Sequence, residues 1–229
     1  MIQPYQSARA RLYDYADGDQ FAGQEPSQVF EDIAKSRTWT SEESISGLGS
    51  TLAQTRELIA GLPGLLAKLG VHSLLDAPCG DFNWMKEVDL SGIAYTGGDI
   101  VAEIVAANES RYGESGRAFQ QLDLMSSELG DHDLLFCRDC LVHLSFSDIS
   151  EVLANLKRSN IRYLMTTTFP EEPGNEEIVT GGWRPLNLQL APFYFPAPIM
   201  LLNENCTEMN GAFADKSLAV WEVSLLTTL

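Results

Sequence analysis

The stretch LLDAPCGDFNWM, residues 74 to 85, decides the fold. It begins as a short apolar run, passes through a tight turn that contains Pro78 and Gly80, and continues into the start of a helix. A buried strand that ends in Asp76 and is followed at once by a turn and a helix is typical of an open α/β sheet. Ligands of such sheets bind at the carboxyl ends of the strands, beside the first N–H groups of the next helix.

The chain after His72 alternates short apolar runs with helical patterns, which predicts parallel strands joined by crossover helices. Two further apolar runs near the C-terminus predict an antiparallel hairpin at the sheet edge. We expect strands over 73–77, 93–99, 118–123, 133–137, 163–168, 199–203 and 217–223, and helices over 84–88, 101–112 and 147–158, the last capped by Ser147 or Asp148.

Two segments have a different character from the rest of the chain. Residues 1–70 are predicted to form a helical cap or extension, with two amphipathic helices broken at Pro63. Residues 71–229 are predicted to form the main domain, with a lid insertion at 170–198 that holds six of the ten prolines. The N-terminal helices either cover the sheet or close over a ligand, and the sequence leaves both alternatives open.

Charge and composition exclude several classes of protein. The 229 residues include 15 basic and 32 acidic side chains, a net charge of −17, which disfavours binding to nucleic acid or to anionic membranes. No stretch approaches the roughly 18 apolar residues of a membrane span, and the start does not resemble a signal peptide, so we expect a cytoplasmic protein. Cys137 and Cys140 form a CxxC pair, but no second pair completes a zinc site.

Carboxylates follow three of the predicted strands. Asp99 lies 99 − 80 = 19 positions after Gly80, close to the ~20 expected for an acid that binds a ribose diol. Asp123 precedes Leu124 and Met125, an arrangement suited to the amino group and flat ring of adenine. The dinucleotide pattern GxGxxG is absent, and Asp81 stands near the position of a second glycine. Acids at this turn would repel a diphosphate and suit a ligand that carries positive charge.

The segments DAPCGDFNWM, GGDI, QLDLM and DLLFCRDCLVHL resemble the successive cofactor motifs of class I S-adenosylmethionine-dependent methyltransferases, in particular a bacterial branch with the motif DxPCGDFNWM. The resemblance covers about residues 70–169 and the final hairpin. It implies a Rossmann-like, doubly wound sheet of seven strands, with Asp76 and Gly80 at the methionine end of S-adenosylmethionine, Asp99 at the ribose and Asp123 at the adenine. The implied cofactor site comprises Asp76, Pro78, Gly80, Asp81, Trp84, Asp99, Ile100, Asp123, Leu124 and Arg138.

The methyl acceptor is expected beside the end of the fourth strand. His143 is the best general base by side-chain type, and Asp139 is placed to orient it or to bind an acceptor hydroxyl. Trp183 and Arg184 of the lid are candidates for binding an aromatic ring and an anionic group of the acceptor. The alternatives are that His143 is an ordinary core residue and that Arg184 pairs with one of the many acids.

Two absent motifs narrow the chemistry. No Asn/Asp-Pro-Pro-aromatic run follows the fourth strand, and no Asp-Asn pair follows the fifth, so planar amine acceptors and a catechol-type Mg²⁺ site are disfavoured. Metal-free O-methylation of a small molecule remains the leading hypothesis. The rivals are an inactive S-adenosylmethionine-binding subunit and a nicotinamide-dependent reductase, the latter disfavoured because GxGxxG and a Tyr-xxx-Lys dyad are both missing.

Overall fold

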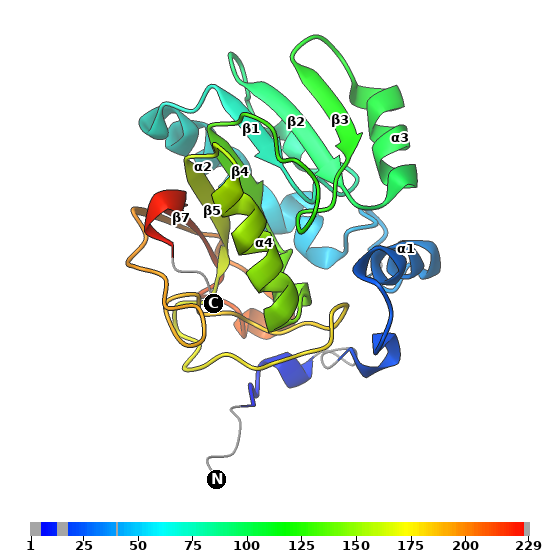
Figure 1. The fold of residues 1–229 in the computed structure, drawn as a ribbon, viewed down its shortest axis with the longest axis vertical. Coiled ribbons are helices and arrows are strands. Elements are labelled where there is room, and N and C mark those ends of the chain that lie inside the picture. Colours follow the sequence, from blue (N-terminus) through cyan, green and yellow to red (C-terminus); the bar gives the residue numbers. More distant parts are fainter. Residues whose placement is uncertain (1–5, 13–17, 40, 227–229) are drawn as a thin grey trace.

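The computed structural model describes residues 6–12, 18–39 and 41–226, which fold around one seven-stranded sheet (Figure 1). The strand order is β3-β2-β1-β4-β5-β7-β6; the first five strands are parallel, and β7 runs antiparallel to both of its neighbours. The predicted mostly parallel sheet with an antiparallel C-terminal hairpin is therefore confirmed. The strands are β1 (Ser73–Asp76), β2 (Ala94–Asp99), β3 (Arg117–Gln121), β4 (Leu134–Cys137), β5 (Tyr163–Thr168), β6 (Met200–Asn203) and β7 (Ser217–Glu222).

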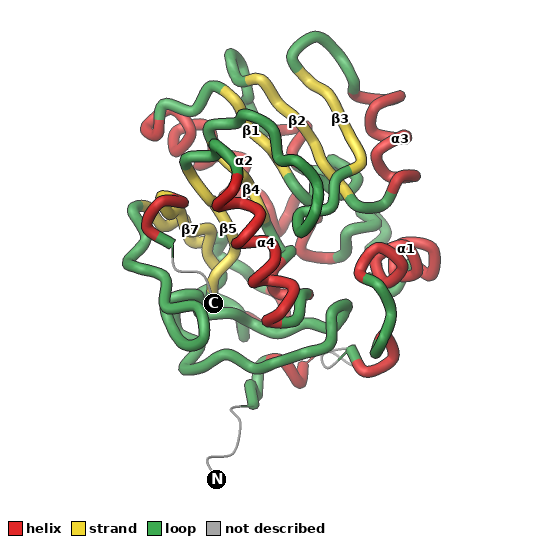
Figure 2. Tube along the Cα trace, viewed as in Figure 1, coloured by secondary structure: helices red, strands yellow, loops and turns green. Residues whose placement is uncertain are grey.

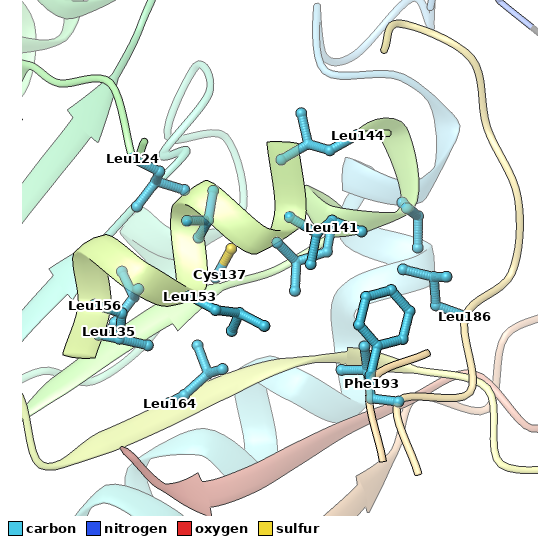
Figure 3. Packing of buried hydrophobic residues seen from close by; sticks show 14 of the residues in the cluster. Leu124, Leu135, Cys137, Leu141, Leu144, Leu153, Leu156, Leu164, Leu186 and Phe193 are labelled. Atoms are coloured by element: carbon cyan, nitrogen blue, oxygen red, sulfur yellow. The ribbon is translucent and has the colours of Figure 1, made fainter. Parts of the chain in front are cut away.

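The central strands are buried on both faces, and their side chains alternate between two cores. In β4, Leu134 and Phe136 face one core while Leu135 and Cys137 face the other, as the two-residue period of a strand requires. Helix α4 (Phe146–Arg158) covers one face, and α2 (Leu52–Leu69) with α3 (Ala102–Tyr112) covers the opposite face (Figure 1). Figure 3 shows α4 pressed onto β4 and β5. The sheet is thus doubly wound, as predicted.

Helix α2 corrects the prediction of a break at Pro63. It runs without interruption from Leu52 to Leu69, with Pro63 in its interior. Leu58, Leu62 and Leu66 repeat every four residues, and all three are fully buried against the sheet. Burial of each leucine stabilises the helix by about 1.5–3 kcal/mol, so the apolar stripe offsets the roughly 3 kcal/mol that an interior proline costs.

The other helical elements lie close to their predicted positions. Residues 84–88 form only a 3₁₀ turn over Met85–Glu87, and α4 begins one residue early because the Ser145 hydroxyl, not Ser147 or Asp148, caps it by accepting the N–H of Asp148. Among the helices of the described residues, none combines the length and the apolarity needed to cross a bilayer. The remaining helices are α1 (Pro26–Ser36), α5 (Glu208–Gly211) and 3₁₀ turns at Ala10–Leu12, Asp19–Phe21, Leu48–Ser50, Leu141–His143 and Val223–Leu225.

Residues 170–198 form a long coil without helix or strand, as the prolines predict (Figure 2). The coil is nevertheless an integral part of the core. Leu186, Leu188 and Phe193 are fully buried, and Figure 3 shows Leu186 and Phe193 packed near Leu141 and the start of α4. The segment therefore packs against the turn that follows β4 and against the start of α4.

Replacing Pro63 by alanine is expected to stabilise the protein. The substitution restores an N–H that can bond within α2 and removes the ring, so we expect the free energy of unfolding to rise by about 1–3 kcal/mol. Urea unfolding of the variant and the parent measures this. Gly64→Ala is the matched control, because a Cβ there meets nothing within 4 Å and should add only about 1 kcal/mol. A Pro63→Ala variant less stable than the parent would show that the core needs the proline.

Candidate functional site

A cavity of about 420 Å³ lies at the carboxyl ends of β1, β2 and β4, where an open α/β sheet binds its ligands. Residues 45–50 and parts of α1 and the C-terminal segment complete its walls. Twelve of the fourteen site residues expected from the sequence line it; Asp81 and Arg184 do not. The twelve are Asp76, Pro78, Gly80, Trp84, Asp99, Ile100, Asp123, Leu124, Arg138, Asp139, His143 and Trp183.

Two buried carboxylates form the floor of the cavity. The Tyr95 hydroxyl donates to Oδ2 of Asp76 at 2.6 Å, and the Gly80 and Val101 N–H groups donate to Asp99 at 3.1 and 3.0 Å. Neither acid has an ion-pair partner among the described residues. Burial raises the pKa of Asp76 to about 7, against the Tyr95 hydrogen bond, and burial raises that of Asp99 to about 6. This floor suits a ligand that brings hydroxyl donors and positive charge.

The turn after β1 (residues 77–83) requires a glycine. Gly80 has φ +53°, and a Cβ added there would lie 2.3 Å from Oγ of Ser46. The Asn108 amide donates to the Gly80 carbonyl at 2.7 Å and fixes the turn from below. A side chain at position 80 would therefore displace the N-terminal segment that covers the cavity.

Asp123 lines the cavity together with apolar side chains that follow β2 and β3 or lie in the first turn of α3, here called the apolar slot. Its two oxygens accept the N–H of Met125 at 2.9 Å and the hydroxyl of Ser126 at 2.6 Å, so it also closes the turn after β3. The slot suits a flat, largely apolar ring whose polar edge reaches Asp123. Ile100, Val101, Ile104, Leu122, Leu124 and Met125 line it.

Asp81 does not line the cavity, contrary to the expectation that it contacts the cofactor. Its Oδ1 accepts the Ser44 hydroxyl at 2.9 Å, and its Oδ2 accepts the N–H of Ile45 at 3.0 Å. The carboxylate is directed at the N-terminal segment because the turn gives it no side facing the cavity. Its partners lie 36 and 37 positions earlier, and no local spacing in the sequence indicates them.

A charged cluster borders the end of β4, with Arg138, Glu204 and Lys216 buried and Asp139 half-buried. Arg138 donates two hydrogen bonds to Glu204, at 3.2 and 2.7 Å, and Nζ of Lys216 lies 2.6 Å from Oδ2 of Asp139. Burial alone would raise the pKa of Asp139, but Arg138 and Lys216 together hold it well below its usual range. Asp139 therefore stays ionised, unlike Asp76. The sequence reasoning missed Glu204 and Lys216, since they follow the long coil.

His143 faces the cavity in a defined tautomer. Its Nδ1 lies 2.7 Å from the Gly182 carbonyl, which can only accept, so Nδ1 carries the proton, and the Nε2 lone pair accepts no hydrogen bond from the described residues. The Gly182 carbonyl, rather than Asp139, therefore orients the ring. Burial lowers the pKa of His143 to about 4, although the carbonyl and the nearby Asp139 oppose this shift. The imidazole is consequently neutral at physiological pH.

Aromatic rings wall the cavity around His143. Trp39 stacks on the imidazole with ring centroids 4.2 Å apart, and its buried indole N–H has no partner among the described residues. Trp183 packs edge-on against Phe213, with centroids 5.0 Å apart, and against Phe169. Trp183 is the only residue of the described 170–198 coil that lines the cavity. Trp39 begins the irregular loop at 39–50 that we expect from the sequence to close over the site, whereas Phe213 was not expected there because it follows no strand end.

Arg184 does not line the cavity, contrary to the expectation that it binds the acceptor. It is fully buried, and its guanidinium donates to the carbonyls of Glu176, Leu141 and Leu144 at 3.1, 2.9 and 2.6 Å. All three guanidinium nitrogens are thus committed to backbone oxygens. Arg184 ties the coil to the turn that carries His143, and it pairs with backbone rather than with an acid.

The free energy of unfolding of the Asp76→Asn variant should rise relative to that of the parent as the pH rises. An unfolded aspartate titrates near ~3.9, whereas the pKa of Asp76 in the folded protein is about 7, so the folded state holds the extra proton between these values. The parent therefore loses stability from pH ~4 to 7, and the variant does not. At ~1.36 kcal/mol per pH unit, the gap should widen by about 2–3 kcal/mol between pH 5 and 8 in urea unfolding. A constant gap would show that Asp76 titrates normally.

Comparisons with known proteins agree with this fold. No family model matches the chain, and no curated protein is similar in sequence. The structure of a Burkholderia thailandensis 1,6-didemethyltoxoflavin-N1-methyltransferase is similar with TM-score 0.60 and 17% identity, over 96% of this chain and 93% of that one. Human N-acetylserotonin methyltransferase in complex with S-adenosylmethionine gives TM-score 0.59 and 16% identity over 93% of this chain, which spans 64% of the human chain. The chain thus has the Rossmann-like methyltransferase fold.

Proposed function

We propose that this protein transfers a methyl group from S-adenosylmethionine to a hydroxyl oxygen of a small, ring-bearing acceptor, without a metal ion. Two observations on neighbours support the cofactor: the human structure contains S-adenosylmethionine, and the Burkholderia structure contains S-adenosylhomocysteine together with 1,6-didemethyltoxoflavin. When bound, S-adenosylmethionine supplies an electrophilic methyl group on a positively charged sulfur. The protein has to orient the acceptor, exclude water and accept one proton.

The cofactor would lie along the strand ends. Asp99 accepts the ribose hydroxyls with the lone pairs that its backbone bonds leave unused, and Asp123 with its apolar slot holds the adenine. Asp76 and the Gly80 turn receive the methionine end, where an unpaired buried carboxylate suits a cation. Arg138, whose guanidinium lies 5.5 Å above the Trp84 ring, also lines the cavity. Glu204, Asp139 and the Gly49 carbonyl leave it one Nη1 hydrogen, which suits the cofactor carboxylate.

The Nε2 atom of His143 is the observation that most supports O-methylation. It is a proton acceptor on the cavity wall, fixed in place through Nδ1, and it remains neutral above about pH 5 because burial lowers its pKa to about 4. Such a weak base does not ionise a phenol in advance. The hydroxyl becomes strongly acidic as its oxygen bonds to carbon, however, and Nε2 can take the proton at that stage. The ionised Asp139 nearby stabilises the imidazolium that results.

The aromatic wall favours a flat acceptor. Trp39, which stacks on His143, and Trp183 both line the cavity, and stacking orients a planar ring without needing charge. Residues 45–50 close the cavity from the N-terminal side and help to exclude water. We propose that these two walls set the choice of acceptor, with Trp183 as the contribution of the 170–198 coil.

Transfer of a labelled methyl group tests the function. The purified protein is incubated with S-[methyl-¹³C]adenosylmethionine and a panel of hydroxylated aromatic compounds. We expect formation of S-adenosylhomocysteine and a product whose carbon shift is that of a methyl ether. A methylated ring nitrogen would replace O-methylation by N-methylation, and cofactor binding without turnover on any acceptor would favour a binding subunit.

Asp99→Asn should weaken binding of S-adenosylmethionine by about 1.5–3 kcal/mol. The amide keeps one oxygen for the turn but loses the charge that strengthens the bonds from the ribose hydroxyls. Isothermal titration calorimetry measures the change, and circular dichroism checks that the variant is folded. Unchanged affinity in a folded variant would remove Asp99 from the cofactor site.

His143→Asn should lower kcat by about 10²- to 10⁴-fold and leave S-adenosylmethionine affinity unchanged. The asparagine amide can still donate to Gly182, so the loss isolates the role of Nε2. In the parent, kcat should fall only as the pH approaches about 4, because His143 is neutral above that pKa. A rate that falls near pH 6.5, or a fully active variant, would contradict a base at this position.

A further inference from the structure

The turn after β1 grips the N-terminal segment at two points. The first is Asp81, whose carboxylate accepts the Ser44 hydroxyl at 2.9 Å and the Ile45 N–H at 3.0 Å. A backbone N–H held by a carboxylate is a charge-assisted bond, stronger than a neutral one. Asp81 thus fixes residues 44 and 45 to the turn without facing the cavity.

The second point is Asn83. Its amide donates to Oε1 of Glu43 at 2.8 Å and to the Ser50 carbonyl at 3.1 Å. The same Glu43 oxygen accepts the N–H of Leu52 at 2.7 Å, where α2 begins. Residues 43–50, the roof segment, are therefore held near both ends by two side chains of the sequence DFN that follows Gly80.

The roof segment covers the cavity directly. Every residue from Ile45 to Ser50 lines it. Oγ of Ser46 lies 2.3 Å from the position of a Cβ on Gly80, and Arg138 donates to the Gly49 carbonyl at 2.9 Å. A ligand on the strand ends therefore has the roof segment between its turn-bound end and solvent.

We propose that Asp81 and Asn83 are positioning residues that latch the roof segment over the S-adenosylmethionine site, so that the cofactor enters and leaves only when the latch opens. This inference rests on the proposed cofactor. Asn83 is half-buried and Ile45 is 37% exposed, whereas Ser44 is only 3% exposed. Water can therefore replace the bonds of Ile45 and Asn83, and these bonds can break without unfolding of the core. Asp81, which stands near the position of a second glycine, thus holds the roof segment closed over the cavity.

A latch and a direct cofactor contact differ in kinetics. If the latch weakens equally in the free and bound protein, association and dissociation both accelerate and Kd changes little. If Asp81 instead touched the cofactor, dissociation alone would accelerate and Kd would rise by the same factor. The ratio of the two rate constants therefore separates the roles.

Stopped-flow tryptophan fluorescence with S-adenosylhomocysteine measures both rates, since Trp39, Trp84 and Trp183 line the cavity. For Asp81→Asn we expect both rate constants to rise by roughly tenfold or more. Ser44→Ala should cause a smaller rise in the parent and none in the Asp81→Asn background. Asp89→Asn is the control and should change neither rate, because this exposed carboxylate bonds only to nearby Ser91 among the described residues.

Hydrogen exchange of the ligand-free protein tests the latch independently of the cofactor. The amides of residues 43–50 should exchange faster in Asp81→Asn, and those of β4 should not. If the parent fails to bind S-adenosylmethionine in calorimetry, the proposed function fails while this measurement still judges the latch. Unchanged exchange of residues 43–50 in Asp81→Asn would overturn the proposal. So would an Asp81→Asn variant in which only the dissociation rate constant rises and this rise adds to the effect of Ser44→Ala.

Discussion

Burial of the central strands on both faces is the constraint on which the rest of the structure depends. β1 and β4 alternate between two apolar cores, so neither strand can hold an unpaired polar side chain along most of its length. Polar groups can appear only where the strands end, and parallel strands all end at one edge. Asp76, Asp99 and Asp139 consequently meet at a single cavity although they are far apart in the sequence.

The surroundings of each group then decide its charge. Asp139 has Arg138 and Lys216 within ion-pair distance and stays ionised, whereas Asp76 has only a neutral hydroxyl, and its pKa rises. His143 is equally buried, but its one defined partner is a carbonyl, so burial keeps it neutral. The cavity therefore combines a floor that gains from a cationic ligand with a wall that can accept a proton.

Local patterns predicted the sheet well and the connections between distant segments poorly. All seven strands lie within two residues of their predicted positions, because period, turn residues and strand ends are local signals. Pro63 misled the prediction because burial of an apolar stripe outweighed a local preference. The partners of Asp81, the bonds from Arg184 to the Leu141 and Leu144 carbonyls, and the approach of Lys216 to Asp139 depend on tertiary packing across 36 to 77 positions, which no spacing reveals.

The reversed hairpin explains how the C-terminal segment reaches the site. Since β7 lies between β5 and β6 and runs antiparallel to β5, its first residue, Ser217, lies beside the last residue of β5, Thr168. The residues just before β7 are therefore delivered to the same edge as the parallel strand ends, which places Lys216 and Phe213 on the cavity wall. A parallel seventh strand would bring its amino end to the opposite edge. The antiparallel direction of β7 thus brings the cation of Lys216 and the aromatic ring of Phe213 to the site.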